Sequence, residues 1–383
     1  MKKIYLDYAA TTPVDSAVEK EMRPYLLKNF GNPSSLHSFG QAAINALDSA
    51  REKISGLLGA DFRQILFTGS ATEANNLILR GVLKKSKDSI VNPRIIVSAI
   101  EHESILETCK DLEKDGVEII YLPVNQDGLV DLEKLKDSLN GRVILVSIMY
   151  ANNEIGTIQP ISEISKIIKD FRKNKFPLFH TDAVQAVQYL NCDVKELGVD
   201  AMTISGHKIY GPKGVGALYL SDLNFCEAVV TGGGQEFRLR SGTENVAGII
   251  GLTKSLELAV KNRGKESKKV LKLRDYFWEK IQKIYPAAGL NGSLEKRLPN
   301  NLNIYLPGYS AQDFLISLDM AGVAASAGSA CFSRTCQPSY VIKALGYSID
   351  RATRSVRFSL GKQTTKLEID EVLRRLEPSL PPC

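Results

Sequence analysis

The sequence predicts an α/β fold: a large, mainly parallel β-sheet flanked by helices, together with a smaller α+β domain. Two observations lead to this prediction. Short apolar runs alternate with amphipathic helical patterns through most of the first 250 residues, as they do in βαβ units. After about residue 260 the pattern changes to a long charged helix followed by shorter strand-like runs. The smaller domain is therefore expected in the last third of the chain.

Four strand–helix pairs account for the large sheet. The strands are expected at QILFTGS (64–70), RIIVSAI (94–100), RVILVSIMY (142–150) and FPLFHTDA (176–183). The helical patterns that follow them are ATEANNLILRGVL, EHESILETCKDLEKDG, ISEISKIIKDFRKN and VQAVQYL. A further helix is expected over 39–58, where one stripe carries Ala43, Leu47, Ala50, Ile54 and Leu57.

The smaller domain has its own elements. Its long charged helix is KNRGKESKKVLKLRDYFWEKIQKIY (261–285). LNIYLPG and SVRFSLG predict strands, and a helix is expected after Pro338. Thr365 and Glu368 have the spacing of a capping box and predict the start of a final helix.

Composition excludes several classes of protein. The 383 residues are 44% apolar and 24% charged, with a net charge of +6, which is typical of an ordinary globular protein. The sequence contains no block of five like charges, which would indicate a nucleic-acid surface. It also contains no apolar run of about eighteen residues, the length needed to cross a membrane. MKKIYLDYAA does not resemble a signal peptide, and the six cysteines are scattered without a C-x-x-C pair. We therefore expect a cytoplasmic protein with reduced thiols.

Polar residues follow several predicted strands, where ligands of parallel sheets gather. Thr72 begins a helix, so it suits either a phosphate site or a plain N-cap. Four more residues suit either a site or a structural role at a strand end or turn: His102, Asn153, Asp182 and Gln185. Taken together with a loop lysine, a phosphate cradle and a strand-end aspartate are the parts that hold pyridoxal phosphate.

SGHKIYGPKG (205–214) contains that lysine. Gly206 and Gly211 have the spacing of a phosphate-binding P-loop, but Pro212 stands where that motif needs its lysine. Lys208 instead follows another predicted strand, DAMTIS (200–205). The P-loop interpretation therefore fails, and Lys208 suits either a functional site or a plain surface position in the loop.

Eight motifs occur in an order that resembles a known family: LDYAATTP, GNPSSLH, GSATEANN, ANNEIG, HTDAVQ, SGHKIYGPKGVGALY, RSGTEN and SAGSAC. From about residue 4 to about residue 375 the chain resembles the cysteine desulfurases, pyridoxal 5'-phosphate enzymes with the class V aminotransferase fold. The resemblance implies a homodimer whose large domain covers 15–260 and whose small domain is built from 1–14 and 261–383. It also implies L-cysteine as substrate and a sulfur acceptor or scaffold protein as partner.

The resemblance assigns four residues to the ring of the cofactor. Lys208 would hold pyridoxal phosphate as a Schiff base, and Asp182 would pair with the pyridine nitrogen. Gln185 would contact the ring hydroxyl. His102 would stack on the ring and take part in proton transfer.

Other residues are assigned to the phosphate and the substrate. The phosphate contacts would be Ala71, Thr72, Ser205 and His207, with Thr243 reaching across from the second subunit. Asn153 and Arg357 would hold the carboxylate of the substrate, and Asn153 would also contact the cofactor.

Cys331 lies in a loop rich in small residues, about 324–338, which predicts an accessible thiol. The resemblance implies that Cys331 carries the persulfide, delivers sulfur for iron–sulfur cluster assembly or tRNA thiolation, and can transiently ligate a nascent cluster. No resident metal is expected. Cys336 lies outside the family pattern and suits a sulfur relay, a disulfide partner or no role at all. A selenocysteine lyase, or another class V lyase or aminotransferase, stays open as the alternative.

Overall fold

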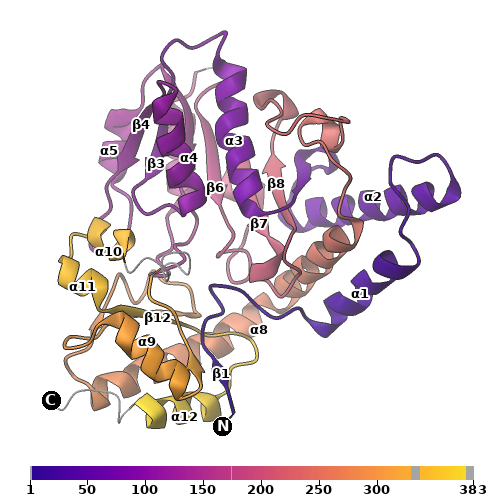
Figure 1. Ribbon diagram of the computed structural model, residues 1–383. Helices are drawn as coiled ribbons and strands as arrows, with labels where there is room; N and C mark the ends of the chain where they lie inside the picture. Colours follow the sequence, from indigo (N-terminus) through magenta and orange to yellow (C-terminus); the bar gives the residue numbers. More distant parts are fainter. Residues whose placement is uncertain (1, 174, 329–336, 377–383) are drawn as a thin grey trace.

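A seven-stranded sheet lies in the upper half of the molecule in Figure 1. The computed structural model describes residues 2–173, 175–328 and 337–376. Only β8 runs against its neighbours, and every other pair in the sheet is parallel. The prediction of a mainly parallel sheet is therefore confirmed. In spatial order the strands are β2 (Ile65–Thr68), β8 (Gly216–Leu220), β7 (Ala201–Ser205), β6 (Leu178–Asp182), β5 (Val143–Ser147), β3 (Arg94–Ser98) and β4 (Glu118–Leu122).

Helices cover both faces of this sheet, which is why most residues of its strands are apolar. One face packs against α3 (Ala71–Ser86) and α4 (Glu103–Lys114). The other face packs against α2 (Ser38–Leu58), α5 (Leu132–Ser138), α6 (Ile161–Phe171) and α7 (Val194–Leu197). On α2 four of the five residues of the expected stripe are buried, whereas Leu57 is half-buried and the neighbouring Leu58 is buried instead.

The helix expected from VQAVQYL does not form. Residues 184–189 make a series of turns, in which the amides of Ala186 and Val187 both donate to Ala183 O. The amide of Val184 donates to the Asp182 carboxylate (3.0 Å). This prediction was wrong, and the turns place Gln185 beside Asp182.

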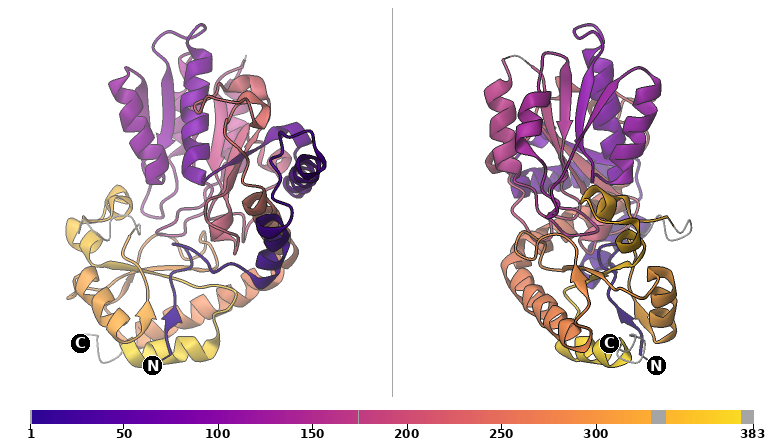
Figure 2. Two further views of the ribbon diagram at one scale, coloured as in Figure 1. Left: turned by 45° about the vertical axis from the view of Figure 1, so that its right-hand side comes forward. Right: turned by 90° about the vertical axis from the view of Figure 1, so that its left-hand side faces the viewer.

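Two small sheets lie below the large one (Figure 2). The first has the order β12 (Ser355–Ser359), β10 (Asn301–Tyr305) and β9 (Gly289–Leu290), and is antiparallel. The second joins the N-terminal strand β1 (Ile4–Tyr5) to β11 (Val323–Ala324). Around them lie α9 (Ala311–Met320), α10 (Tyr340–Ala344), α11 (Ile349–Thr353) and α12 (Lys366–Leu376).

The capping box is confirmed at the start of α12. The amide of Thr365 donates to the Glu368 carboxylate (3.1 Å), and the amide of Glu368 donates to Thr365 Oγ1 (3.2 Å). The strands expected from LNIYLPG and SVRFSLG are β10 and β12, and the helix expected after Pro338 is α10.

The charged helix starts earlier than expected. It is α8 (Val246–Ile284), 39 residues long, and it crosses residue 260 without a break. Its first part packs against α1 (Ser16–Leu27) and α2, and its later part against α12 and β10. The domain limits at 14 and 260 stay a prediction. None of the helices in the described ranges is both long enough and apolar enough to cross a membrane.

Candidate active site

A cavity of about 450 Å³ opens at the carboxyl ends of β5, β6 and β7, where the large sheet faces β12 and the N-terminal segment. This volume suits a small-molecule ligand. The cavity brings together most of the predicted site residues: Ala71, Thr72, His102, Asn153, Asp182, Gln185, Ser205, His207, Lys208 and Arg357.

Lys208 enters the cavity from the 3₁₀ turn Gly206–Lys208, directly after β7. Its Nζ donates to the carbonyls of Ala9 (2.8 Å) and Ala10 (2.7 Å). Gln185 Nε2 donates to the same Ala9 carbonyl (3.0 Å). The N-terminal segment therefore meets the lysine and the glutamine at one point, which explains why residues so far apart in sequence share a cavity.

A buried hydrogen-bond chain links His102 to Asp182. Asn75, on α3, is fully buried, and its Nδ2 donates both to Ser104 Oγ (2.8 Å) and to Asp182 Oδ2 (2.8 Å). Ser104 Oγ in turn lies 2.9 Å from His102 Nδ1, which also accepts from the Ser104 amide (3.1 Å). Since Nδ1 is an acceptor here, the ring proton belongs on Nε2.

Burial and neighbouring charge keep both histidines of the cavity neutral near pH 7. Burial lowers the pKa of His102, and Asp182 partly offsets this while Lys208 lowers it further. Burial, with Lys208 and Lys213 nearby, lowers the pKa of His207 to about 4. A neutral imidazole can accept a proton, so the arrangement suits proton transfer at His102.

The N-terminus of α3 forms one wall of the cavity. Ser70 is the N-cap, and its Oγ accepts from the Glu73 amide (3.1 Å), so the interpretation of Thr72 as the cap is wrong. The first amides of a helix lack intrahelical partners, and here they belong to Ala71 and Thr72. With Ser205 on the same cavity wall, these donors suit a phosphate group.

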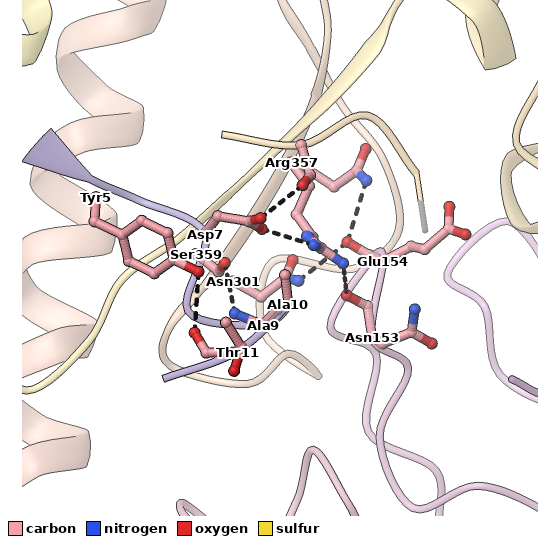
Figure 3. A network of polar contacts seen from close by, with 12 residues as sticks. Tyr5, Asp7, Ala9, Ala10, Thr11, Asn153, Glu154, Asn301, Arg357 and Ser359 are labelled. Carbon is pink, nitrogen blue, oxygen red and sulfur yellow. Dashed lines mark hydrogen bonds and ion pairs between the residues drawn. The ribbon is translucent and has the colours of Figure 1, made fainter. Parts of the chain in front are cut away.

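Arg357, on β12, lines the side of the cavity that faces the large sheet. Figure 3 shows its contacts. It lies between Asp7 and Asn153: Nη2 donates to Asp7 Oδ1 (2.8 Å) and Nη1 to the Asn153 carbonyl (2.8 Å). Arg357 Nε and Asn153 Oδ1 are buried, and neither has a hydrogen-bond partner among the described residues. One unsatisfied donor and one unsatisfied acceptor match the carboxylate and the ammonium group of an amino acid.

Two predicted residues stand apart from this cavity. Thr243 is exposed and lines a separate hollow of about 90 Å³ with Gly69, Arg240 and Glu244. Cys331 lies outside the described residues, as does Cys336. In the ranges 2–173, 175–328 and 337–376, no group of three His, Cys, Asp or Glu side chains could hold a metal ion.

Comparison with known proteins agrees with this fold. A family model described as aminotransferase class-V matches residues 4–372, so the chain belongs to that family. Within it the chain falls among the cysteine desulfurases. It is 47% identical over 376 residues to the cysteine desulfurase IscS of Dictyoglomus turgidum, a match that covers 98% of this chain and 94% of that one.

Two solved structures are similar over nearly the whole chain. One, described as a NifS-like protein, has a TM-score of 0.92 at 36% identity, covering 98% of this chain and 99% of its own. The other, described as SspA in complex with cysteine, has a TM-score of 0.81 at 34% identity, covering 95% and 100%. Enzymes of this family depend on pyridoxal 5'-phosphate, and this chain is one of them.

The cavity fits that cofactor. It offers a lysine amine, a buried carboxylate in Asp182, helix amides for a phosphate and an unsatisfied Asn153 Oδ1. Sequence reasoning missed Asn75 and Ser104, which join Asp182 to His102. A signal for Asn75 was present: it is a polar residue on the stripe of α3 that also carries Ile78, Leu79 and Val82, and such residues are usually held by buried partners.

Proposed function

We propose that this chain is a cysteine desulfurase, which converts L-cysteine to L-alanine and keeps the sulfur as a persulfide on Cys331. The observation that carries the proposal is a single cavity lined by Lys208, His102 and Asp182 together with Arg357 and Asn153, each of which carries a buried polar atom without a partner among the described residues. The similarity to cysteine desulfurases over almost the whole chain supports the same reaction.

Each residue has a task in this proposal. When bound, pyridoxal phosphate supplies an electron sink for charge that develops at the substrate Cα. Lys208 would hold the cofactor and then, as a released amine, move the Cα proton, with neutral His102 as a second base. Asp182, held in place by Asn75, would stabilise a positive charge on the pyridine nitrogen of the cofactor. Arg357 Nε and Asn153 Oδ1 would orient the amino acid.

The sulfur step balances without an outside oxidant. The Cys331 thiolate attacks the sulfur of the substrate, and a sulfur–sulfur bond forms. The bond between that sulfur and the substrate Cβ breaks, and its electron pair stays on Cβ, which takes up a proton to give alanine. The attack needs a thiolate. A thiol with an unperturbed pKa of ~8.5 is about one-tenth ionised near pH 7.5.

The test is a turnover assay with L-cysteine. Wild type loaded with cofactor should be yellow, form alanine and carry an alkylatable persulfide that peptide mass places on Cys331. Lys208→Ala should lose the yellow absorption of the lysine-bound cofactor. Cys331→Ala should stay yellow but make no persulfide. A colourless wild type, or alanine formed at the normal rate by Cys331→Ala, would end this proposal. Selenocysteine offered in parallel distinguishes a selenocysteine lyase.

We further infer a homodimer in which Thr243 completes the phosphate site of the partner. Thr243 is exposed and lies outside the cavity of its own chain, so it can act only if another copy approaches. Leu26, Phe30 and Leu36 are 62%, 70% and 92% exposed, and such apolar surface is typical of an interface.

Mixed dimers test this inference. Lys208→Ala and Thr243→Val chains are each expected to be impaired alone. After subunit exchange, one site of the mixed dimer has an intact Lys208 and an intact Thr243 from the other chain, so activity should return. No recovery after verified exchange would exclude a shared site.

The persulfide needs an acceptor, and we propose that a protein of iron–sulfur cluster assembly or tRNA thiolation receives it. A cytoplasmic location is part of this proposal, since Cys109, Cys192 and Cys226 are buried free thiols. Transfer of labelled sulfur from Cys331 to a candidate scaffold protein, detected by mass spectrometry, would support this acceptor. Failure to transfer to any thiol protein would contradict it.

A further inference from the structure

Glu154 is a buried carboxylate that the proposed mechanism does not use. It follows Asn153 in the loop after β5, and its exposed fraction is 0%. Its backbone carbonyl accepts from Asn301 Nδ2 (3.0 Å) and Asn303 Nδ2 (3.1 Å), both on β10 (Figure 3 shows the Asn301 contact). The large sheet and the small antiparallel sheet are therefore joined at the residue next to Asn153.

The side chain of Glu154 reaches the residues on both sides of segment 329–336. After the segment, Ser339 Oγ donates to Glu154 Oε2 over 2.6 Å, a short distance typical of a charge-assisted hydrogen bond. Before the segment, a Cβ atom added to Gly328 would lie 3.3 Å from Oε2 and 3.6 Å from Ser339 Cβ. Gly328 also has φ +61°, which favours glycine. The two ends thus meet at one carboxylate.

A second contact fastens the same end of the segment near His102. Tyr340, which follows Ser339, donates its hydroxyl to the Glu101 carbonyl over 2.6 Å. Consecutive residues after the segment are therefore tied to the two loops that carry His102 and Asn153. Glu154 itself does not line the cofactor cavity, so contact with the cofactor does not explain why this carboxylate is buried.

Resting on the function proposed above, we infer that Glu154 is a positioning residue for the sulfur-transfer step. It holds the two ends of the segment that carries Cys331 against the loop that carries the substrate-facing Asn153. Because its contacts lie outside the cavity, its loss should spare cofactor and substrate binding and slow the attack of the Cys331 thiolate.

Ser339→Ala is the primary variant, because it removes the donor to Glu154 and leaves the carboxylate in place. Ser348→Ala is a matched control. Ser339 caps α10 and Ser348 caps α11, helices of five residues each, and each Oγ accepts one amide over 3.2 Å. The control loses the same kind of cap without a carboxylate contact. Ser339→Thr keeps the hydroxyl, and Glu154→Gln weakens the contact from the other side.

The measurements separate binding from sulfur transfer. Cofactor affinity and the change in visible absorption on adding L-cysteine report binding, and single-turnover alkylation followed by peptide mass reports the persulfide on Cys331. For Ser339→Ala and Glu154→Gln we expect binding within about twofold of wild type and persulfide formation at least about tenfold slower. Ser348→Ala should stay within about twofold in both, and Ser339→Thr should recover most of the rate.

Three results would overturn the inference. Persulfide formation at the wild-type rate in Ser339→Ala would show that the contact is irrelevant. An equal slowing in Ser348→Ala would show that capping, and not Glu154, is responsible. Loss of cofactor binding together with the persulfide would give Glu154 a general structural role. A wild type that binds L-cysteine but never forms the Cys331 persulfide would refute the proposed function itself, and the inference with it.

Discussion

Arg51 and Glu236 form a buried ion pair whose loss should be measurable as a change in stability. Their side chains are 4% and 1% exposed, and two hydrogen bonds of 2.8 Å join the guanidinium to the carboxylate. Glu236 also accepts from the Phe67 amide (2.8 Å), and the guanidinium stacks on the rings of Phe67 (4.7 Å) and Phe237 (4.9 Å). Three consecutive residues, 236–238, have positive φ, so the pair holds a strained turn in place.

The expected magnitude follows from this burial. Replacing Arg51 by Met leaves the Glu236 carboxylate uncompensated, and breaking a buried pair in this way costs about 3–5 kcal/mol. Unfolding entropy is about 2.1 cal/mol/K per residue, or roughly 0.8 kcal/mol/K for 383 residues. Arg51→Met should therefore lower Tm by about 5 °C. Adding Glu236→Gln should recover part of this loss, because the buried charge is then gone.

Thermal unfolding of cofactor-free protein, followed by circular dichroism, is a direct assay. Lys283→Met is the control, since Lys283 pairs with Glu279 on the surface with side chains 63% and 60% exposed. Such pairs contribute about 0–1 kcal/mol, so Tm should change by about 1 °C or less. If Arg51→Met changes Tm no more than the control, or if the two substitutions at the buried pair are simply additive, the reasoning is refuted.

Three further predictions concern the site and its surroundings. Asp182→Ala should keep some cofactor but form alanine more than about tenfold more slowly, because the electron sink is weakened. Activity within tenfold of wild type would show that Asp182 has only the structural role of a turn residue. Cys336→Ser should keep most desulfurase activity with a simple reductant, and a persulfide found first on Cys336 would reverse the assignment of Cys331. Burial lowers the pKa of His180 to about 3 from 6.5, so the unfolded chain binds the proton more tightly and stability is lost as pH falls below 6.5. Chemical denaturation at pH 7 and pH 5 should differ by about 2 kcal/mol more in wild type than in His180→Gln; equal differences would contradict it.

Elements with a strong local signal could be predicted from the sequence. The strand that ends at Ser98 contains the apolar run Ile95–Val97, and the strand that ends at Asp182 begins with Leu178 and Phe179 before its polar residues. The helix that begins beside Thr365 has a capping pair close in sequence. The early part of α8 lacked such a signal, because Gly248 and Gly251 disfavour a helix. The reason for Gly251 is tertiary, because a Cβ there would lie 2.6 Å from Met22 Sδ of α1, whereas a Cβ on Gly248 would meet the N-cap residue Asn245.

The candidate site shows the same division. Lys208 and His102 could be proposed because each follows a strand directly. The pattern of α3 indicates only that Asn75 is buried, and the roles of Asn75 and Glu154 depend on partners 107 and 185 residues away, Asp182 and Ser339. The sequence contains both residues but gives no indication of which distant side chains will lie against them.

Helix α8 has a mechanical consequence. At about 1.5 Å per residue its 39 residues extend for roughly 58 Å. Ile249, Leu252 and Leu256 belong to the core of the large sheet, whereas Val270 and Phe277 belong to the core of the small sheets. A rotation of one core against the other would have to bend this helix and break its backbone hydrogen bonds. We therefore expect substrate to enter and alanine to leave through movements of single loops at the rim of the cavity, with the two cores moving as one body.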